Sequence, residues 1–166
     1  MQPAPVVTGW RCSACGTRVA ISEIFSWRCP NSSDSDRHHV LELENSIAPL
    51  RSSGDTNPYV GFQRYLAWDA FAATLGLDFD ARTKIIRELD DAVSVVAGTG
   101  FRTTPFARHD ALSDELGFSQ QGGVWIKDET HNVAGSQKAR HLFSELLHLI
   151  AVEQVDRAPW KSPSLL

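Results

Sequence analysis

Two long stretches of the chain carry apolar residues at three- and four-residue steps, the spacing of one face of an α-helix. Between residues 80 and 97 these positions are Ile85, Ile86, Leu89, Ala92, Val93 and Val96. Gly98 and Gly100 follow them and are expected to end the helix. In the second stretch the positions are Ala139, Leu142, Phe143, Leu146, Leu147 and Ile150. The spacing predicts two amphipathic helices, and the second should begin near Ser136 and end before Pro159.

Shorter sequence patterns predict further elements before and between these two helices. Pro58 should start a helix that runs to about Leu75, before Gly76. The segment HDALSDELGF predicts a short helix closed by Gly117, and residues 124–126 form an apolar strand signal after a Gly-Gly turn. Strand, loop and final helix in this order are half of a βαβ unit, so we expect an α/β fold with the start of a parallel sheet. The next strand would begin at KSPSLL, where the sequence stops, so the fold is expected to be truncated or completed by another chain.

Composition limits the function classes. The 166 residues are 42% hydrophobic and 22% charged, which is typical of a folded protein with one ordinary domain. The formal net charge is −4 and the basic residues form no run, so nucleic acid is not an expected partner. No stretch offers about 20 uninterrupted apolar residues, and the N-terminus does not have the pattern of a signal peptide. We therefore expect no membrane span and a cytoplasmic location.

Three cysteines, Cys12, Cys15 and Cys29, lie in a β-rich N-terminal module of residues 1–47 that is too small to bury a core unaided. Its strand candidates are WRCSACGTRVAI, FSWRCP and HHVLEL, and a turn-rich linker, residues 48–57, separates it from residues 58–166. An odd number of cysteines without a secretion signal argues against a disulfide framework. Metal binding or free thiols remain.

Cys12-x-x-Cys15-Gly16 resembles the knuckle of a zinc ribbon, in which two thiolates supply half of a tetrahedral site. The second half offers only Cys29, and His38 or His39 could supply the fourth ligand. Neighbours on a strand point to opposite faces, so only one of the two histidines can serve. We expect zinc on Cys12, Cys15, Cys29 and His38, and the alternative is a ribbon-shaped module without metal.

Lys138 follows Gly135-Ser136-Gln137 at the start of the last predicted helix. Helix N-termini carry partial positive charge, which disfavours a protonated amine there. A neutral amine is a nucleophile that can form a Schiff base with an aldehyde, and Gly135-Ser136 offers a ligand a hydroxyl and backbone N–H groups. The alternative is an exposed, inert side chain in the first helical turn.

The tract from Arg102 to Arg140 resembles the N-terminal signature of the fold-type II, tryptophan-synthase-β-like pyridoxal-phosphate enzymes, which include threonine synthase and threonine or serine dehydratase. The matching elements occur in the family's order and are Thr104-Pro105-Phe106, a short helix, Lys127-Asp128-Glu129, and Asn132-Val133-Ala134-Gly135-Ser136-Gln137-Lys138-Ala139-Arg140. The departures are Val133-Ala134 and Gln137, which leave the substrate identity open. The similarity covers residues 101–150, and some threonine synthases also carry a ribbon-like N-terminus.

The resemblance implies that Lys138 is the Schiff-base lysine, with Ser136 and Asn132 shaping the loop beside pyridoxal phosphate. It implies the N-terminal portion of a lyase or synthase that acts on small hydroxy-amino acids. The family's Gly-rich phosphate cradle lies downstream of the lysine helix and has no counterpart here. The alternative is therefore an inactive, truncated remnant or an interaction module, and a complementing chain or a homo-oligomer could complete the sheet. A zinc-ribbon adaptor for protein or nucleic acid is a third hypothesis, which the acidic balance disfavours.

Overall fold

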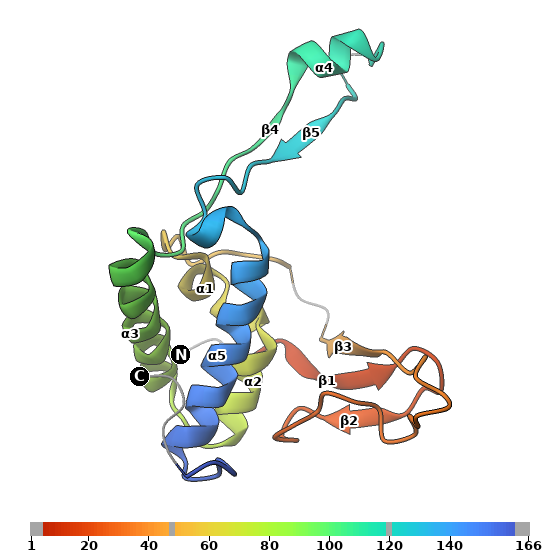
Figure 1. Cartoon of the computed structure of the whole chain (residues 1–166), viewed down its shortest axis with the longest axis vertical. Helices are drawn as coiled ribbons and strands as arrows, with labels where there is room; N and C mark the ends of the chain where they lie inside the picture. The colour runs from red at the N-terminus through yellow and green to blue at the C-terminus, as the bar shows by residue number, and fades with distance from the viewer. Residues whose placement is uncertain (1–4, 47–48, 119–120, 162–166) are drawn as a thin grey trace.

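The computed structural model describes residues 5–46, 49–118 and 121–161 of the chain. Figure 1 shows three parts: a small N-terminal sheet, a helical unit beside it, and an arm that projects from the helical unit. The fold is mixed α/β, and every strand pairing among the described residues is antiparallel. The helical unit supplies most of the buried apolar residues.

The N-terminal sheet has the strand order β2-β1-β3, formed by β1 (Val7–Cys12), β2 (Arg18–Ala20) and β3 (Leu41–Asn45). β1 pairs with both neighbours, and Trp10 lies opposite Leu43. The first and third strand candidates from the sequence are confirmed, the first being split into β1 and β2. The FSWRCP prediction is wrong, because residues 25–30 form turns and loop without a partner strand.

The predicted helix from Pro58 to Leu75 is divided into three pieces. They are α1 (Pro58–Gly61), a 3-10 turn η1 (Gln63–Tyr65) and α2 (Ala67–Thr74), with Leu66 in an extended conformation before α2. The break has a structural consequence at Gln63, whose buried amide donates to Asp69 at 2.8 Å. Six residues of continuous helix rise about 9 Å, so an unbroken helix would keep these side chains apart.

The two long helices are confirmed. α3 (Phe79–Ala97) begins after Asp78, whose carboxylate accepts the Ala81 N–H, and ends at Gly98 in the left-handed conformation. α5 spans Lys138–Gln154. Leu142 was expected on its buried side but is 60% exposed. The buried stripe of α5 follows Phe143, Leu147 and Ile150 at four- and three-residue steps, and Leu142 lies beside it, toward solvent.

The core lies between α1, α2, α3 and α5, and it contains a cluster of three aromatic rings. Tyr59, Phe101 and Phe143 form a mutual cluster with ring centroids 4.5 to 5.2 Å apart, in tilted and edge contacts. The Tyr59 hydroxyl donates to the Arg140 carbonyl at 2.5 Å, which fixes α1 against the first turns of α5. Burial raises the pKa of Tyr59 to about 12, so its hydroxyl stays a donor at neutral pH.

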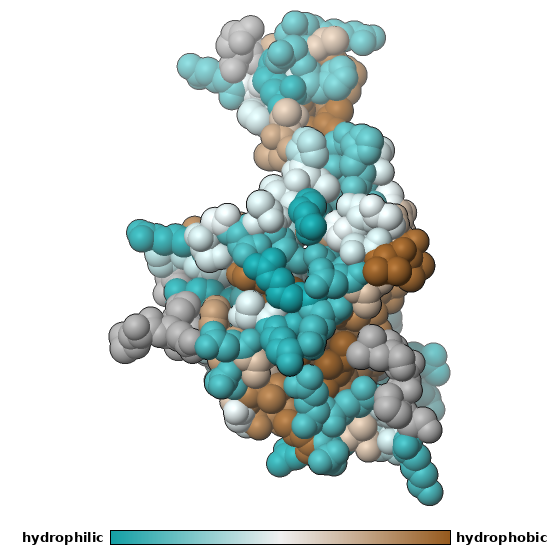
Figure 2. Space-filling view, turned by 90° about the vertical axis from the view of Figure 1, so that its left-hand side faces the viewer, coloured by the Kyte–Doolittle hydropathy of each residue, from teal (hydrophilic) through white to brown (hydrophobic). Residues whose placement is uncertain are grey.

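The arm consists of β4 (Phe106–Arg108), α4 (Asp110–Glu115) and β5 (Trp125–Lys127). The predicted short helix and the 124–126 strand are thus present, but β5 runs antiparallel to β4 and is exposed along its length. The expected start of a parallel sheet is not seen among the described strands. The reason is local: α4 turns the chain at the tip of the arm, so β5 returns alongside β4. Figure 2 shows apolar surface on this arm, to which Phe106 and Trp125 contribute.

A buried carboxylate fixes the loop that follows α3. Asp90 is 5% exposed and accepts hydrogen bonds from the Asn57 side chain at 2.9 Å and from the Phe101 N–H at 2.6 Å. Arg102 lies at 3.2 Å from the same carboxylate. Gly100 is required here, because a Cβ at this position would lie 2.7 Å from Asp90 Oδ2. Asp90 therefore joins α1, α3 and the segment that leads to the arm.

We predict that Asp90→Ala lowers the free energy of unfolding by about 3 kcal/mol, because the Asn57 amide and the Phe101 N–H would be left buried without an acceptor. Urea denaturation followed by circular dichroism measures the change. Asp91→Ala is the matched control, since Asp91 is the exposed neighbour on the same helix and should change stability by no more than about 0.5 kcal/mol. Equal stability of the two variants would contradict the role given to Asp90.

Candidate metal centre

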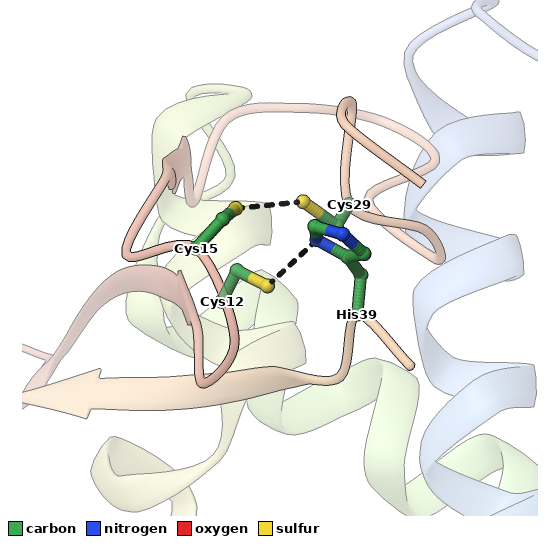
Figure 3. A group of neighbouring side chains, drawn as sticks. All are labelled: Cys12, Cys15, Cys29 and His39. Carbon is green, nitrogen blue, oxygen red and sulfur yellow. Dashed lines mark hydrogen bonds between the residues drawn. The ribbon is translucent and has the colours of Figure 1, made fainter. Parts of the chain in front are cut away.

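Four side chains from the N-terminal sheet and its loops converge on one point (Figure 3). Cys12 ends β1, Cys15 lies in the turn after it, Cys29 lies in the loop between β2 and β3, and His39 precedes β3. Their ligand atoms all lie within 4.8 Å of one another, close enough to hold a metal ion. Cys12 and Cys29 are buried, Cys15 is exposed, and the His39 side chain is 10% exposed.

The local backbone explains why the first two thiols face the same point. The Cys12 N–H donates to the Thr17 carbonyl at 2.8 Å, and the Gly16 N–H donates to the Cys12 carbonyl at 2.9 Å. Gly16 has a φ of +73°, which L-residues with a side chain rarely adopt. This tight turn brings Cys15 back toward the end of β1. The sulfur atoms of Cys15 and Cys29 lie 3.6 Å apart, and Cys12 Sγ lies 3.4 Å from His39 Nδ1.

Polar neighbours favour the thiolate form at two of the three cysteines. The hydrogen bond with the Thr17 hydroxyl, at 3.2 Å, and the Thr17 N–H lower the pKa of Cys15 to about 5. The Cys15 N–H is the main cause that lowers the pKa of Cys12, whereas burial raises the pKa of Cys29. A thiolate is the form of cysteine that binds metals, so Cys15 is prepared for that role at neutral pH.

Asp36 orients the histidine. Its Oδ2 atom lies 3.2 Å from His39 Nε2, while the opposite ring nitrogen, Nδ1, points to Cys12. Contacts with Cys12, then with Cys15 and Asp36, raise the pKa of His39. A carboxylate on one ring nitrogen holds the proton there and leaves the other nitrogen free as a metal ligand. The Asp36 and His39 pair therefore has the arrangement of a metal-ligating histidine with its outer-sphere partner.

The structure brings His39, and not His38, to the three cysteines. This corrects the choice of His38 as fourth ligand. His38 is exposed, and its backbone N–H lies 3.4 Å from Asp36 Oδ1. The alternation of side chains in an extended segment is the physical reason, because adjacent residues point in opposite directions in the segment that leads into β3 at Leu41.

Two contributors to this centre were not singled out from the sequence. Asp36 lies three residues before His39 in the Ser/Asp-rich loop, and Asn31 donates to the Thr17 hydroxyl at 2.8 Å beside Cys15. The His39 spacing from Asp36 was a usable signal, because a carboxylate commonly accompanies a ligating histidine. The Asn31 contact spans 14 residues of sequence and had no local signal.

The residues of the predicted cofactor site lie in and just before the first turn of α5. Asn132 is buried and its side-chain amide donates to the Ser136 carbonyl at 3.0 Å. The Ser136 hydroxyl accepts the Lys138 N–H at 3.1 Å. Lys138 is the first residue of α5 and is exposed, and it lines neither hollow found around the N-terminal sheet. The Schiff-base role of Lys138 stays a prediction.

Comparison with protein-family models, with curated proteins and with solved structures found no match. The resemblance to fold-type II enzymes accordingly stays an interpretation of the sequence. Across the part of the chain that the structure describes, no helix has both the length and the apolar composition that crossing a bilayer requires.

We predict that Asp36→Ala lowers the metal affinity about 10- to 100-fold, the usual cost of removing an outer-sphere partner of a ligating histidine. Competition with a chromophoric chelator measures the affinity. Asp34→Ala is the matched control, because Asp34 lies on the same loop and pairs only with the exposed Arg37 among the contacts recorded for it. Affinity lost equally in both variants would show a loop-wide effect and contradict the role of Asp36.

Proposed function

We propose that Cys12, Cys15, Cys29 and His39 bind one zinc ion, and that the ion stabilises the N-terminal sheet beside the helical unit. Three thiolates and one imidazole are a common ligand set of structural zinc sites. The observation that carries the proposal is the convergence of these four ligand atoms from separate turns within 4.8 Å.

The spacing of the ligand atoms supports this choice of metal. In a tetrahedral site with Zn–S of about 2.3 Å and Zn–N of about 2.0 Å, two sulfurs lie about 3.8 Å apart and a sulfur and a nitrogen about 3.5 Å apart. Two of the ligand-atom distances are close to these values, 3.6 Å between Cys15 and Cys29 and 3.4 Å between Cys12 and His39, and all four ligand atoms lie within 4.8 Å of one another. Thiolate ligands also favour zinc over magnesium or calcium, which prefer oxygen.

A site with four protein ligands supports a structural role. Catalytic zinc sites keep one position for water or substrate, whereas structural sites are closed by four side chains. The N-terminal sheet has few buried residues of its own, chiefly Val6, Val7, Cys12 and Cys29. So small a core needs an additional source of stability, and the free energy of metal binding would supply it.

The zinc site would also fix how the module meets the helices. The loop after β2 carries Ile21 and Ile24, which pack against the helical core. His148 on α5 hydrogen-bonds the Ile24 carbonyl at 2.6 Å, and the Val6 N–H donates to the Arg64 carbonyl at 2.8 Å. Cys15 and Cys29 flank this loop in sequence, so the metal would hold its two ends together. The proposed function is therefore that of a zinc-stabilised protein module on a helical scaffold.

We expect the purified chain to contain one zinc ion and His39→Ala to lose most of it, because the site would keep only three ligands. Elemental analysis by mass spectrometry measures the metal content, and thermal unfolding measures the accompanying loss of stability. His38→Ala is the matched control and should retain the wild-type metal content. Full zinc content in His39→Ala, or its loss in His38→Ala, would contradict this ligand assignment.

A pyridoxal-phosphate function is a second proposal, which concerns the start of α5. It rests on the sequence resemblance, and the observation that favours it is that α5 begins at Lys138 directly after the Ser136 loop. The cofactor would supply an aldehyde for a Schiff base. Lys138 is exposed at the start of α5, so an aldehyde in solution could reach its amine.

Reduction of a mixture of the chain and pyridoxal phosphate with borohydride, followed by peptide mass spectrometry, tests this second proposal. A dedicated site predicts that the pyridoxyl group is found on Lys138 well above the other lysines. Lys161 provides the internal reference, since it is an exposed lysine near the other end of α5. Comparable labelling of Lys138, Lys161 and the remaining lysines would count against the cofactor site.

A further inference from the structure

A groove of about 930 Å³ lies between the N-terminal sheet and the helices α2 and α5. It shares His39 with the four-ligand centre, and none of the three cysteines lines it. Its volume is within the range of about 300–1,000 Å³ that is typical of small-molecule sites. Its lining divides into an aromatic and apolar part and a polar part on α5. The aromatic residues of the lining are Trp10, Trp27, Tyr65 and Trp68.

The sheet presents an apolar wall to the groove. Trp10 and Leu43 lie opposite each other in the β1–β3 register, and Leu41 lies two residues from Leu43 on the same face. Leu43 is 42% exposed and Trp27 is 58% exposed, although both line the groove. The described part of the chain therefore leaves part of this apolar wall exposed.

The opposite wall is a polar stripe on α5. It consists of His141, Ser144, Glu145 and His148, which follow one another at the i, i+3, i+4 and i+7 spacing of a single helical face. Among the described residues that line the groove, Glu145 is the only carboxylate and none is a lysine or an arginine. The Glu145 side chain is 42% exposed and lies 4.0 Å from His141.

The other two histidines of the lining are already engaged. His148 hydrogen-bonds the Ile24 carbonyl and stacks on Phe71 with ring centroids 4.0 Å apart. Burial lowers the pKa of His148, so its ring is uncharged at neutral pH. His39 faces the cysteines and Asp36. Glu145 is consequently the one carboxylate that the described lining residues place beside these aromatic rings.

We propose that this groove binds a small organic cation, with a methylated ammonium group against the tryptophan rings and its charge balanced by Glu145. Aromatic faces attract cations, and a methylated ammonium is weakly hydrated, so it can leave water for such a surface at little cost. The lack of lysine and arginine in the lining disfavours an anion. A neutral ligand would cover Glu145 without compensating its charge, which is unfavourable.

Choline is the probe, and its neutral isostere 3,3-dimethylbutan-1-ol, which replaces the nitrogen by carbon, is the control ligand. Both are titrated into the zinc-loaded chain while the indole N–H resonances of the five tryptophans are followed by NMR. We expect saturable shifts for Trp10, Trp27 and Trp68 with choline, and none for Trp125 on the arm. Binding of the neutral isostere should be about tenfold weaker, since the cation–π and carboxylate contacts would be lost.

Two substitutions test the residues. Glu145→Gln should weaken choline binding about tenfold, and Trp27→Ala about fivefold. Glu88→Gln on α3 is the matched charge control, because Glu88 is exposed and is not in the lining of the groove, and it should leave the affinity unchanged. Zinc content is measured in every sample, so loss of the neighbouring metal centre is distinguished from loss of ligand binding. Equal affinity for the neutral isostere, wild-type affinity in Glu145→Gln, or no saturable binding by zinc-loaded protein would overturn the proposal.

Discussion

The convergence of three thiols and one imidazole is the interaction on which the rest of the N-terminal module depends. β1, β2 and β3 are short, and much of their surface is exposed. Burying this little apolar area does not stabilise a module of such size in water. The four ligands come from the end of one strand, a turn and two separate parts of the long loop before β3. A metal ion bound by all four ligands would hold these segments in place, which the hydrogen bonds of the sheet do not do.

The helical unit has its own sources of order, which are apolar packing and two buried carboxylates. The aromatic cluster around Phe143 fills the space between α1 and α5. Asp69 on α2 receives a hydrogen bond from Arg82 on α3 at 2.6 Å, with both side chains buried. A buried pair of this kind fixes the relative position of two helices more than it adds stability, because desolvation offsets much of the attraction. Different interactions would thus stabilise the N-terminal module and the helical unit. The groove lies where the two meet.

The spacing of apolar residues and the positions of glycines made much of the helical unit predictable. The three- and four-residue steps located α3 and α5, and Gly98 marked the end of α3 because a left-handed residue suits glycine. The break at Leu66 was not predictable, since it depends on the contact between Gln63 and Asp69 across the interrupted helix. The direction of the strand that pairs with β5 could not be predicted either, because an apolar strand pattern does not specify whether its neighbour runs parallel or antiparallel.

The same distinction applies to the metal centre. The Cys-x-x-Cys-Gly spacing identified Cys12 and Cys15, because the tight turn that brings them together is local. The choice between His38 and His39 depended on the direction of one side chain relative to β3, which the sequence left open between two neighbours. Asp36 was not singled out, although it lies only three residues before His39 and this spacing was a signal in the sequence. A tight turn can be recognised from a short stretch of sequence. A contact such as that of Asn31 with Thr17, which are 14 residues apart, is seen only in the folded chain.

Zinc K-edge X-ray absorption of the purified chain tests the central claim most directly, because it reports the ligand atoms and their distances from the metal. The account predicts a first shell of three sulfur atoms at about 2.3 Å and one nitrogen atom at about 2.0 Å, with the outer-shell signal of one imidazole ring. A shell made of oxygen and nitrogen alone, or one containing a single sulfur, would contradict it.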